Sequence, residues 1–211
     1  MAAALNLDGL LPKLMEQMRE RGVRIIGVSG KKGHGKDTIA DAMVKMHRTG
    51  IIISFASSLK NAVASIFAID SDHMSDPKAK ETVNETLGVT PRRLLQYFGT
   101  DVMRNAFGDN IWIISLCLAA LDIDLRWRDT WRDGDAVTII IPDVRFPNEA
   151  EFVRSYGGTL IRVDASTRVP STDMHISETA LDDYAFPVVI DNNGTRDELF
   201  TRLREAGFLV D

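Results

Sequence analysis

Lys36 closes a glycine-rich run whose spacing suits the binding of phosphate groups. The run reads Gly30-Lys31-Lys32-Gly33-His34-Gly35-Lys36, so a glycine is followed, after four residues, by a Gly-Lys pair. Glycines let successive backbone N–H groups converge on anionic oxygens, and the final lysine adds a mobile cation. A helix that starts at this point would add the partial positive charge of its N-terminus. The run therefore predicts a loop that cradles phosphates.

The residues on both sides of the run predict the elements that such a loop needs. Residues 24–29 are short, apolar and β-branched, as expected of a strand buried on both faces of a parallel sheet. Apolar residues recur at helical spacing from Ile39 to Met46. The alternative is a glycine-rich turn that Asp37 caps and that binds no ligand. The order strand, loop, helix favours phosphate binding, with contacts from Gly30, Lys31, Gly33, His34, Gly35, Lys36, Asp37 and Thr38.

The residue after the lysine departs from the usual pattern. A serine or threonine commonly stands there and binds Mg²⁺ through its hydroxyl, whereas this chain has Asp37 followed by Thr38.

Composition limits the kind of protein. With 211 residues, 45% of them hydrophobic and 26% charged, we expect one globular domain and no membrane span. The N-terminus has no basic leader, which predicts a cytoplasmic protein. The single cysteine, Cys117, lies in an apolar run and is expected to be buried and inert. A net charge of -5 argues against binding of nucleic acid, so local basic clusters would serve small anions.

Strand and helix patterns alternate along the chain. Five short apolar strands are predicted at 24–29, 51–54, 137–141, 159–163 and 187–190. Helices between them imply right-handed crossovers and a three-layer α/β/α fold around a five-stranded parallel sheet. Ligands bind at the carboxyl ends of such strands, which here are Ser29, Ser54, Pro142 and Asp164. A turn that contains Asn193 follows the last strand, and we expect Asn193 to contact the nucleotide.

Other segments surround this alternation. Residues 1–22 form an added helix that becomes regular near Leu11. A helix capped by Ser57 or Ser58 turns Leu59, Ala62, Val63 and Ile66 inward, and residues 70–84 form a mobile lobe or loop. Helices are expected at 91–99, ended by Gly99, at 100–107, and at 110–121 with Leu118 inward. Residues 122–135 form an ion-paired surface segment. Residues 165–181 lack periodicity and suit a lid.

Four motifs together resemble the bacteriophage-type deoxynucleoside monophosphate kinases, a P-loop kinase family related to phosphomevalonate kinase. They are Gly-Lys-Asp-Thr at 35–38, Arg-Arg-Leu-Leu-Gln-Tyr-Phe-Gly-Thr-Asp at 92–101, Ile-Pro-Asp-Val-Arg at 141–145 and His-Ile-Ser-Glu at 175–178. The resemblance covers nearly all of residues 24–205. It implies a nucleoside monophosphate kinase-like P-loop NTPase fold with a lid, and an enzyme that uses ATP and Mg²⁺ to phosphorylate a deoxynucleoside 5′-monophosphate. If a phage encodes the protein, the resemblance also implies a location in the host cytoplasm.

The resemblance also suggests roles for residues outside the loop. Phosphoryl transfer depends on positioning and on cations, so Lys36 would hold the β- and γ-phosphates and Asp143 would serve the metal or the acceptor, unless it only caps the next helix. Thr38 would reach Mg²⁺ directly or through water, and Asp37 would bind the water shell of the metal or orient the acceptor. Arg168, on the lid, would close onto the transferring group. His175 has the weakest case, because the reaction needs no titrating histidine. Residues of about 68–108 would bind the acceptor. The acceptor-binding candidates are Lys60, Arg92, Arg93, Gln96, Tyr97, Asp101, Arg104 and Arg145, and the motif positions favour Arg93 and Arg145.

Two other functions remain open on the sequence. A kinase of another small phosphorylated acceptor, similar to phosphomevalonate kinase, would have the same fold. A nucleotide-binding regulator without turnover would keep the loop but consume no ATP. The sequence leaves open the base of the acceptor and the choice between a monomer and a homodimer.

Overall fold

The computed structural model describes residues 5, 7–127, 136–170 and 176–209. The chain divides into two compact units, one formed by Met1–Leu14 and Phe55–Leu116 and the other by Met15–Ser54 and Cys117–Asp211. We call these unit 1 and unit 2 and describe each by itself. Helices α1 (Leu11–Glu20) and α6 (Ile111–Trp127) contribute residues to both.

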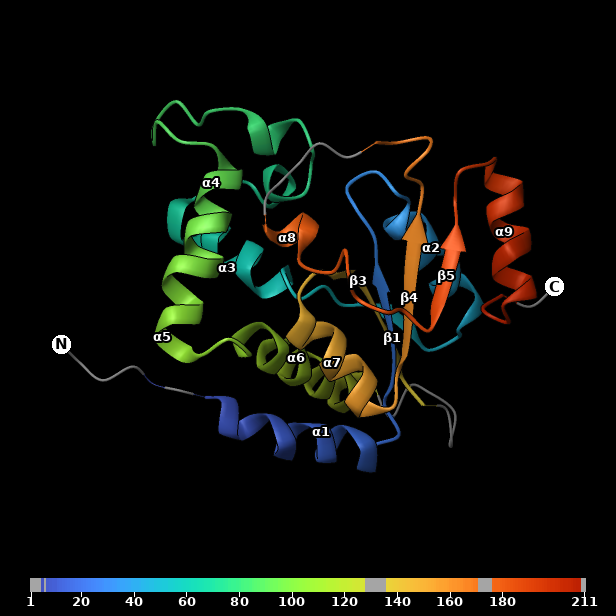
Figure 1. The fold of residues 1–211 in the computed structure, drawn as a ribbon. Helices are drawn as coiled ribbons and strands as arrows, with labels where there is room; N and C mark the ends of the chain where they lie inside the picture. Colours follow the sequence, from blue (N-terminus) through green and yellow to red (C-terminus); the bar gives the residue numbers. More distant parts are fainter. Residues whose placement is uncertain (1–4, 6, 128–135, 171–175, 210–211) are drawn as a thin grey trace. The chain divides into compact units, whose positions relative to one another are not determined.

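Unit 2 contains a five-stranded sheet in which all paired neighbours are parallel (Figure 1). The strand order is β2-β3-β1-β4-β5, which places the strand before the glycine-rich loop in the centre. The predicted five-stranded parallel sheet is confirmed. Its strands are β1 (Arg24–Ser29), β2 (Gly50–Ile52), β3 (Thr138–Val144), β4 (Thr159–Asp164) and β5 (Val188–Asp191).

Helices pack on both faces of this sheet, because the strands are apolar on both sides. On one face, α2 (Lys36–Met46) and α9 (Arg196–Glu205) join the strands in a core that includes Val28, Met43 and Leu203. On the other face, α7 (Pro147–Tyr156) packs against β1 and β4. A Cβ added at Gly27 would lie 2.9 Å from a methyl group of Val153 on α7, so the absence of a side chain there permits this close packing. The short helix α8 (Ile176–Thr179) precedes β5.

β3 is longer than the sequence predicts, and its extension includes a proline. Gly27 of β1 pairs with Ile141, but Ser29 pairs with Val144, so β3 carries one extra residue in this interval. Pro142 has no N–H to donate to a ladder, and a bulge of this kind accommodates it. The bulge contains Pro142 and Asp143, at the end of the strand where ligands are expected.

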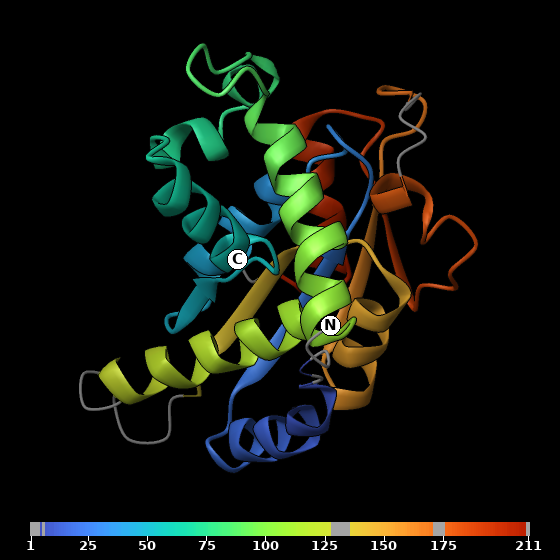
Figure 2. The same cartoon turned by 90° about the vertical axis from the view of Figure 1, so that its left-hand side faces the viewer.

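Unit 1 is helical. It contains η1 (Asp8–Leu10), α3 (Ser57–Phe67), η2 (Ser71–Met74), η3 (Ala79–Glu81), α4 (Pro91–Gln96), a π-helical segment η4 (Tyr97–Arg104), α5 (Asn105–Phe107) and the start of α6. The last three elements before α6 run as one continuous helix (Figure 2). The prediction that Gly99 ends one helix and Thr100 caps another is therefore wrong.

Gly99 serves close packing in this helix rather than termination. Its backbone oxygen accepts a hydrogen bond from Trp112 Nε1 at 3.0 Å, and a Cβ added at Gly99 would lie 2.8 Å from Leu59. A glycine in a helix lowers local stability, but here it lets α3 and α6 approach the π-helical segment. Side chains from neighbouring helices therefore override the local tendency to stop.

Several smaller expectations are also wrong. α3 begins at Ser57 with Ala56 as N-cap, so neither predicted serine is the capping residue. Ala62 and Ile66 of α3 and Leu118 of α6 are exposed rather than turned inward. The prediction failed because apolar spacing alone cannot show which of several helix faces meets a neighbouring element. The segment 70–84 is not a simple loop, since Met74 of η2 is buried.

Cys117 is buried as expected, and burial raises the pKa of its thiol to about 12. Arg126 pairs with Asp122 in the expected ion-paired segment, of which residues 128–135 lie outside the described part.

In the described part of the chain, no helix alone has the length and apolarity needed to cross a membrane. Pro91–Phe107 and Ile111–Trp127 meet that test as a pair, but with a bend of 91° between them. Many side chains in the first half of α6 are buried, as in the core helix of a globular fold.

Candidate active site

The glycine-rich loop follows β1 and leads directly into α2. Gly35 is the N-cap of α2 and has a left-handed φ of 97°. A Cβ at this position would lie 2.5 Å from Asn192 Nδ2, so both the backbone conformation and the space favour glycine. The N–H groups of the first helical turn point out of α2 at this end. Asp37 lies inside the first turn and is not the capping residue, which removes the alternative in which it only caps the helix.

Lys36 is the first residue of α2 and is 8% exposed. Its ammonium donates a hydrogen bond to the Lys31 carbonyl oxygen at 2.8 Å, across the loop. Burial and then the positive charge of Arg145 lower the pKa of Lys36 to about 8, against the opposing effects of Glu178, Asp37 and Asp143. Lys36 therefore shares one electrostatic environment with a second cation and three carboxylates.

Asp143 lies in the bulge of β3, and its carboxylate accepts a hydrogen bond from Ser54 Oγ at 2.6 Å. Ser54 follows β2, so this bond joins the carboxyl ends of two neighbouring strands. The N-cap of α7 is Phe146, so Asp143 does not cap the following helix. The interpretation of Asp143 as a mere helix cap is therefore wrong, while a role toward metal or acceptor stays a prediction.

Arg145 is held through both its backbone and its side chain. Its N–H donates to Glu149 Oε2 at 2.8 Å, and Glu149 is buried at the start of α7. Its guanidinium forms an ion pair with Glu178 of α8 and also approaches the Ser177 carbonyl oxygen. The Arg145 side chain remains 33% exposed. An arginine fixed in this way can present its remaining N–H groups to a phosphate.

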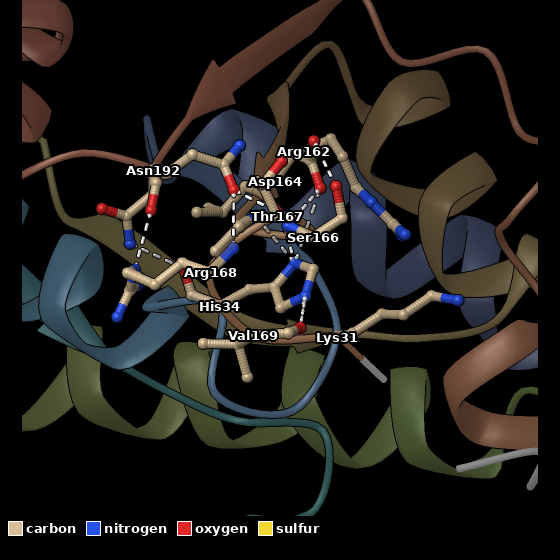
Figure 3. A network of polar contacts seen from close by, with 12 residues as sticks. Lys31, His34, Arg162, Asp164, Ser166, Thr167, Arg168, Val169 and Asn192 are labelled. Atoms are coloured by element: carbon tan, nitrogen blue, oxygen red, sulfur yellow. Dashed lines mark hydrogen bonds and ion pairs between the residues drawn. The ribbon is translucent and has the colours of Figure 1, made fainter. Parts of the chain in front are cut away.

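His34 fastens the loop to the segment that follows β4 (Figure 3). His34 Nδ1 lies 3.1 Å from the Ala165 N–H group and 3.3 Å from the Val163 carbonyl oxygen. The shorter contact, from an N–H that can only donate, makes Nδ1 an acceptor and leaves Nε2 to donate to the Val169 carbonyl oxygen at 3.3 Å. The His34 carbonyl accepts from Asn192 Nδ2 at 2.8 Å. Because the imidazole is 2% exposed and fully engaged, we infer that any phosphate contact of His34 uses its backbone N–H.

A cavity of about 610 Å³ lies beside the loop within unit 2. It is lined by the loop glycines Gly33 and Gly35, by Thr38, and by residues of α2, α9 and the β5–α9 turn. Arg168 lines the same cavity, and its Nε donates to the Asn192 carbonyl oxygen at 3.2 Å. Asn193 accepts from the Thr167 and Arg168 N–H groups through its Oδ1. Arg168 of the predicted lid therefore lines this cavity and also contacts Asn193, whereas His175 lies outside the described residues.

The remaining acceptor candidates belong to unit 1. Most lie on the continuous helix from α4 to η4, and Lys60 lies on α3. Arg92 pairs with Glu81 at 2.5 Å, and Arg104 donates to the Asp109 carbonyl oxygen at 2.8 Å. Arg93, Gln96, Tyr97 and Asp101 are exposed. In the described part of the chain, the Arg93 guanidinium has no hydrogen bond or ion pair, which leaves it available to an anionic ligand.

Sequence reasoning did not select Glu178, Ser54 or Asn192 as site residues. Glu178 accepts a hydrogen bond from the Lys32 N–H at 2.9 Å in addition to its pair with Arg145. Ser54 lies at a strand end, which was a signal for function, and Glu178 lies in the motif at 175–178. Asn192 gave no signal, because its contact with the loop joins residues that are far apart in the sequence.

The residues present fit ATP phosphates, and they fit Mg²⁺ held mainly by those phosphates. The loop offers backbone donors. Lys36 brings a buried cation that donates to the Lys31 carbonyl oxygen but forms no ion pair with a carboxylate among the described residues. No group of three or more His, Cys, Asp or Glu side chains able to hold a metal occurs in the described residues. Mg²⁺ in phosphoryl-transfer sites commonly takes one or two protein ligands and several waters. Thr38, Asp37 and Asp143 suit that arrangement.

A five-stranded parallel sheet in this order, with a glycine-rich loop and a buried lysine at the start of α2, defines a P-loop kinase fold. The family model of deoxynucleotide monophosphate kinases matches residues 71–203, which is more than half of the chain. A protein of Acanthamoeba polyphaga mimivirus that has itself been assigned as a deoxynucleotide monophosphate kinase is 33% identical over 183 residues, covering 85% of this chain and 93% of the relative. The chain belongs to the deoxynucleotide monophosphate kinase family.

Relatives from bacteriophages give the same family. The deoxynucleotide monophosphate kinase of Escherichia phage RB69 is 31% identical over 128 residues, covering 61% of this chain and 48% of the relative. That of Enterobacteria phage T4 is 33% identical over 115 residues, covering 54% and 44%. The match therefore spans less than half the length of these two phage kinases. Among solved structures, a shikimate kinase from Bacteroides thetaiotaomicron aligns with a TM-score of 0.41 and 12% identity, over 87% of this chain and 96% of that one.

Proposed function

We propose that this chain transfers the γ-phosphoryl group of ATP to the 5′-phosphate of a deoxynucleoside monophosphate. An oxygen of the acceptor phosphate forms a bond to the γ-phosphorus, and the bond from that phosphorus to the bridging oxygen of ADP breaks. The products are a deoxynucleoside diphosphate and ADP. The observation that carries the proposal is the buried Lys36, at the end of a glycine-rich loop and in the electrostatic reach of Arg145, in a chain of this family.

The loop and the adjoining cavity support ATP as the donor. Loop N–H groups and Lys36 bind the phosphates, where charge develops on the transferred group. The 610 Å³ cavity beside the loop has the size of a small-ligand site and suits the base and ribose. The Arg196 guanidinium lies over the Phe200 ring at that cavity, 5.2 Å from the ring centroid, and this pair offers a flat surface to a base. Arg168 lies beside the same cavity.

Arg145 supports a phosphorylated acceptor. Its guanidinium can donate two parallel hydrogen bonds to a phosphate, which a lysine cannot do. We assign the exposed Arg93, Gln96, Tyr97 and Asp101 to recognition of the acceptor, with Arg92, Arg104 and Lys60 as further candidates. Mg²⁺ neutralises charge on the phosphates, and we assign Thr38, Asp37 and Asp143 to its ligands or its water shell.

The proposal is tested by measuring ATP consumption with each deoxynucleoside monophosphate and with phosphomevalonate as acceptor. We expect ATP consumption that depends on one or more deoxynucleoside monophosphates and forms the matching diphosphate. Lys36→Ala should abolish it while the protein stays folded, because the substitution removes the cation on the phosphates but no apolar core side chain. Turnover with phosphomevalonate alone, or ATP binding without turnover for any acceptor, would contradict the proposal.

A further inference from the structure

Glu178 joins the glycine-rich loop of residues 30–36, which we now call the phosphate loop, to Arg145 through a single carboxylate. Oε2 accepts a hydrogen bond from the Lys32 N–H at 2.9 Å, and Oε1 accepts from Arg145 Nη1. The Glu178 side chain is 7% exposed, whereas that of Arg145 is 33% exposed. A buried carboxylate is costly unless it is paired, and this one is paired on both oxygens. The acidic group is therefore fixed, while the arginine keeps part of its surface open.

The contacts of Arg145 leave one edge of the guanidinium for a ligand. In the described part of the chain, its guanidinium contacts run through Nη1, to Glu178 and to the Ser177 carbonyl oxygen. The backbone N–H is fixed separately by Glu149. Nη2 and Nε can thus donate to another anion without breaking the pair with Glu178. An arginine that is ordered before its ligand arrives loses less conformational entropy on binding.

We propose that Glu178 is a positioning residue for phosphoryl transfer. Its carboxylate holds the Arg145 guanidinium in a fixed relation to the phosphate loop, so that the open edge of Arg145 meets the acceptor phosphate. This inference rests on the proposed function. The negative charge of Glu178 opposes the binding of phosphate, but its hydrogen bonds orient Arg145, whose positive charge favours the binding of phosphate.

A competing role for Glu178 predicts the opposite sign. If the carboxylate merely occupied donors that phosphate needs, its removal would strengthen the binding of anions near Arg145 and Lys36, because a negative charge would be lost. If it positions Arg145, its removal weakens the binding of the acceptor despite the gain in positive charge. The direction of the change in acceptor affinity therefore separates the two roles.

The first experiment uses Glu178→Gln. The glutamine amide can accept from the Lys32 N–H, but its NH₂ group then faces the N–H donors of Arg145. We expect the Kd for the deoxynucleoside monophosphate, measured by calorimetry, to rise about tenfold and kcat to fall about tenfold, as for the loss of other orienting partners. The Kd for ATP should stay within about threefold. A matched control is Glu151→Gln, which removes an exposed glutamate–arginine pair on α7 with Arg154 and should leave both constants and the melting temperature unchanged.

The second experiment compares Glu178→Gln, Arg145→Ala and the double variant. If Glu178 acts through Arg145, the double variant should lose no more kcat/KM than Arg145→Ala alone. Additive losses, unchanged acceptor affinity or tighter acceptor binding in Glu178→Gln would each overturn the inference while wild-type turnover stands. A wild-type protein that consumes no ATP with any deoxynucleoside monophosphate would overturn the proposed function instead, and the inference with it.

Discussion

Lys36 combines a buried position with a positive charge that the proposed binding of phosphate requires. Burial and the charge of Arg145 lower its pKa to about 8, so near that pH part of the free enzyme holds a neutral amine. Phosphates favour the ammonium form, because an opposite charge raises the pKa of a lysine. If ATP binds at Lys36 as proposed, ATP binding and proton uptake by Lys36 are therefore coupled.

The first prediction follows from this coupling. Above about pH 8 the Kd for ATP should rise, approaching tenfold per pH unit, and binding should take up a proton. Calorimetry from about pH 6.5 to about pH 9.5, in buffers of different ionisation enthalpy, measures both effects. Lys36→Arg should bind ATP less tightly but without the alkaline loss, because its guanidinium stays charged. A wild-type Kd that is constant over this range would contradict the prediction.

The same pKa has a consequence for stability. An unfolded lysine titrates near pH 10.4, so between about pH 8 and that value the unfolded chain binds more protons than the folded one. The contribution of Lys36 to the free energy of unfolding therefore increases as the pH rises through this window. Below about pH 8, the folded protein bears the full cost of a buried ammonium.

Asp37 carries the second prediction. It lies exposed in the first turn of α2 behind the N-cap Gly35, so its effect on the helix is limited to about 0.3–1 kcal/mol from the helix dipole. If its carboxylate serves the Mg²⁺ shell or the acceptor, Asp37→Asn should cut kcat by about 100-fold with a smaller change in ATP affinity. Asp37→Ser should recover little activity, because a hydroxyl does not replace an acceptor contact. Near-normal kcat in both variants, at unchanged melting temperature, would rule out a chemical role.

At the scale of elements, the phosphate loop depends on a segment more than a hundred residues away. His34 Nδ1 accepts from the Ala165 N–H, and Asn192 donates to the His34 carbonyl oxygen. The loop, the segment after β4 and the β5–α9 turn are thus joined by hydrogen bonds (Figure 3). The shape of the loop is a property of three elements together.

The third prediction tests this connection. His34→Ala would leave the buried Ala165 N–H without its acceptor, at a cost of about 1–3 kcal/mol in unfolding free energy. We expect a lower melting temperature and an ATP KM raised about tenfold, with a smaller change in the acceptor KM. His34→Gln keeps one acceptor and one donor and should lose less. Equal effects on the KM values of both substrates would indicate that the histidine does not act through the phosphate loop.

Local signals explain which elements the sequence predicted. The strand from Arg24, the loop and α2 were recognised because strand apolarity, glycine spacing and helical spacing all occur within 25 residues. Gly99 was misassigned because its role depends on Trp112 and Leu59, which its neighbours in sequence do not reveal. Pro142 appeared to end β3, whereas a bulge allows the strand to continue. Predictions failed where a distant partner decides the local structure.

In the molecule as a whole, the candidate active site also contains residues whose positions depend on partners that are distant in the sequence. Lys36, Asp143 and Arg145 could be selected from motifs, since each follows a predicted strand. The position of Glu178 between Lys32 and Arg145 could not, because it depends on how the short helix α8 meets the loop. The side chains that could do chemistry were therefore predictable, whereas the groups that orient them required the fold.

The last prediction concerns the two substrates together. In-line transfer requires the acceptor oxygen to approach the γ-phosphorus, so one ligand that joins adenosine to a deoxynucleoside through five phosphates should satisfy both sets of phosphate-binding groups at once. We expect its Kd, measured by calorimetry, to lie at least about 100-fold below that of ATP, because the second half binds intramolecularly. Arg145→Ala should weaken the joined ligand and the deoxynucleoside monophosphate but not ATP. A joined ligand that binds no better than ATP would show that the two substrates are not held for direct transfer. That result would contradict phosphoryl transfer between two substrates bound together in one active site.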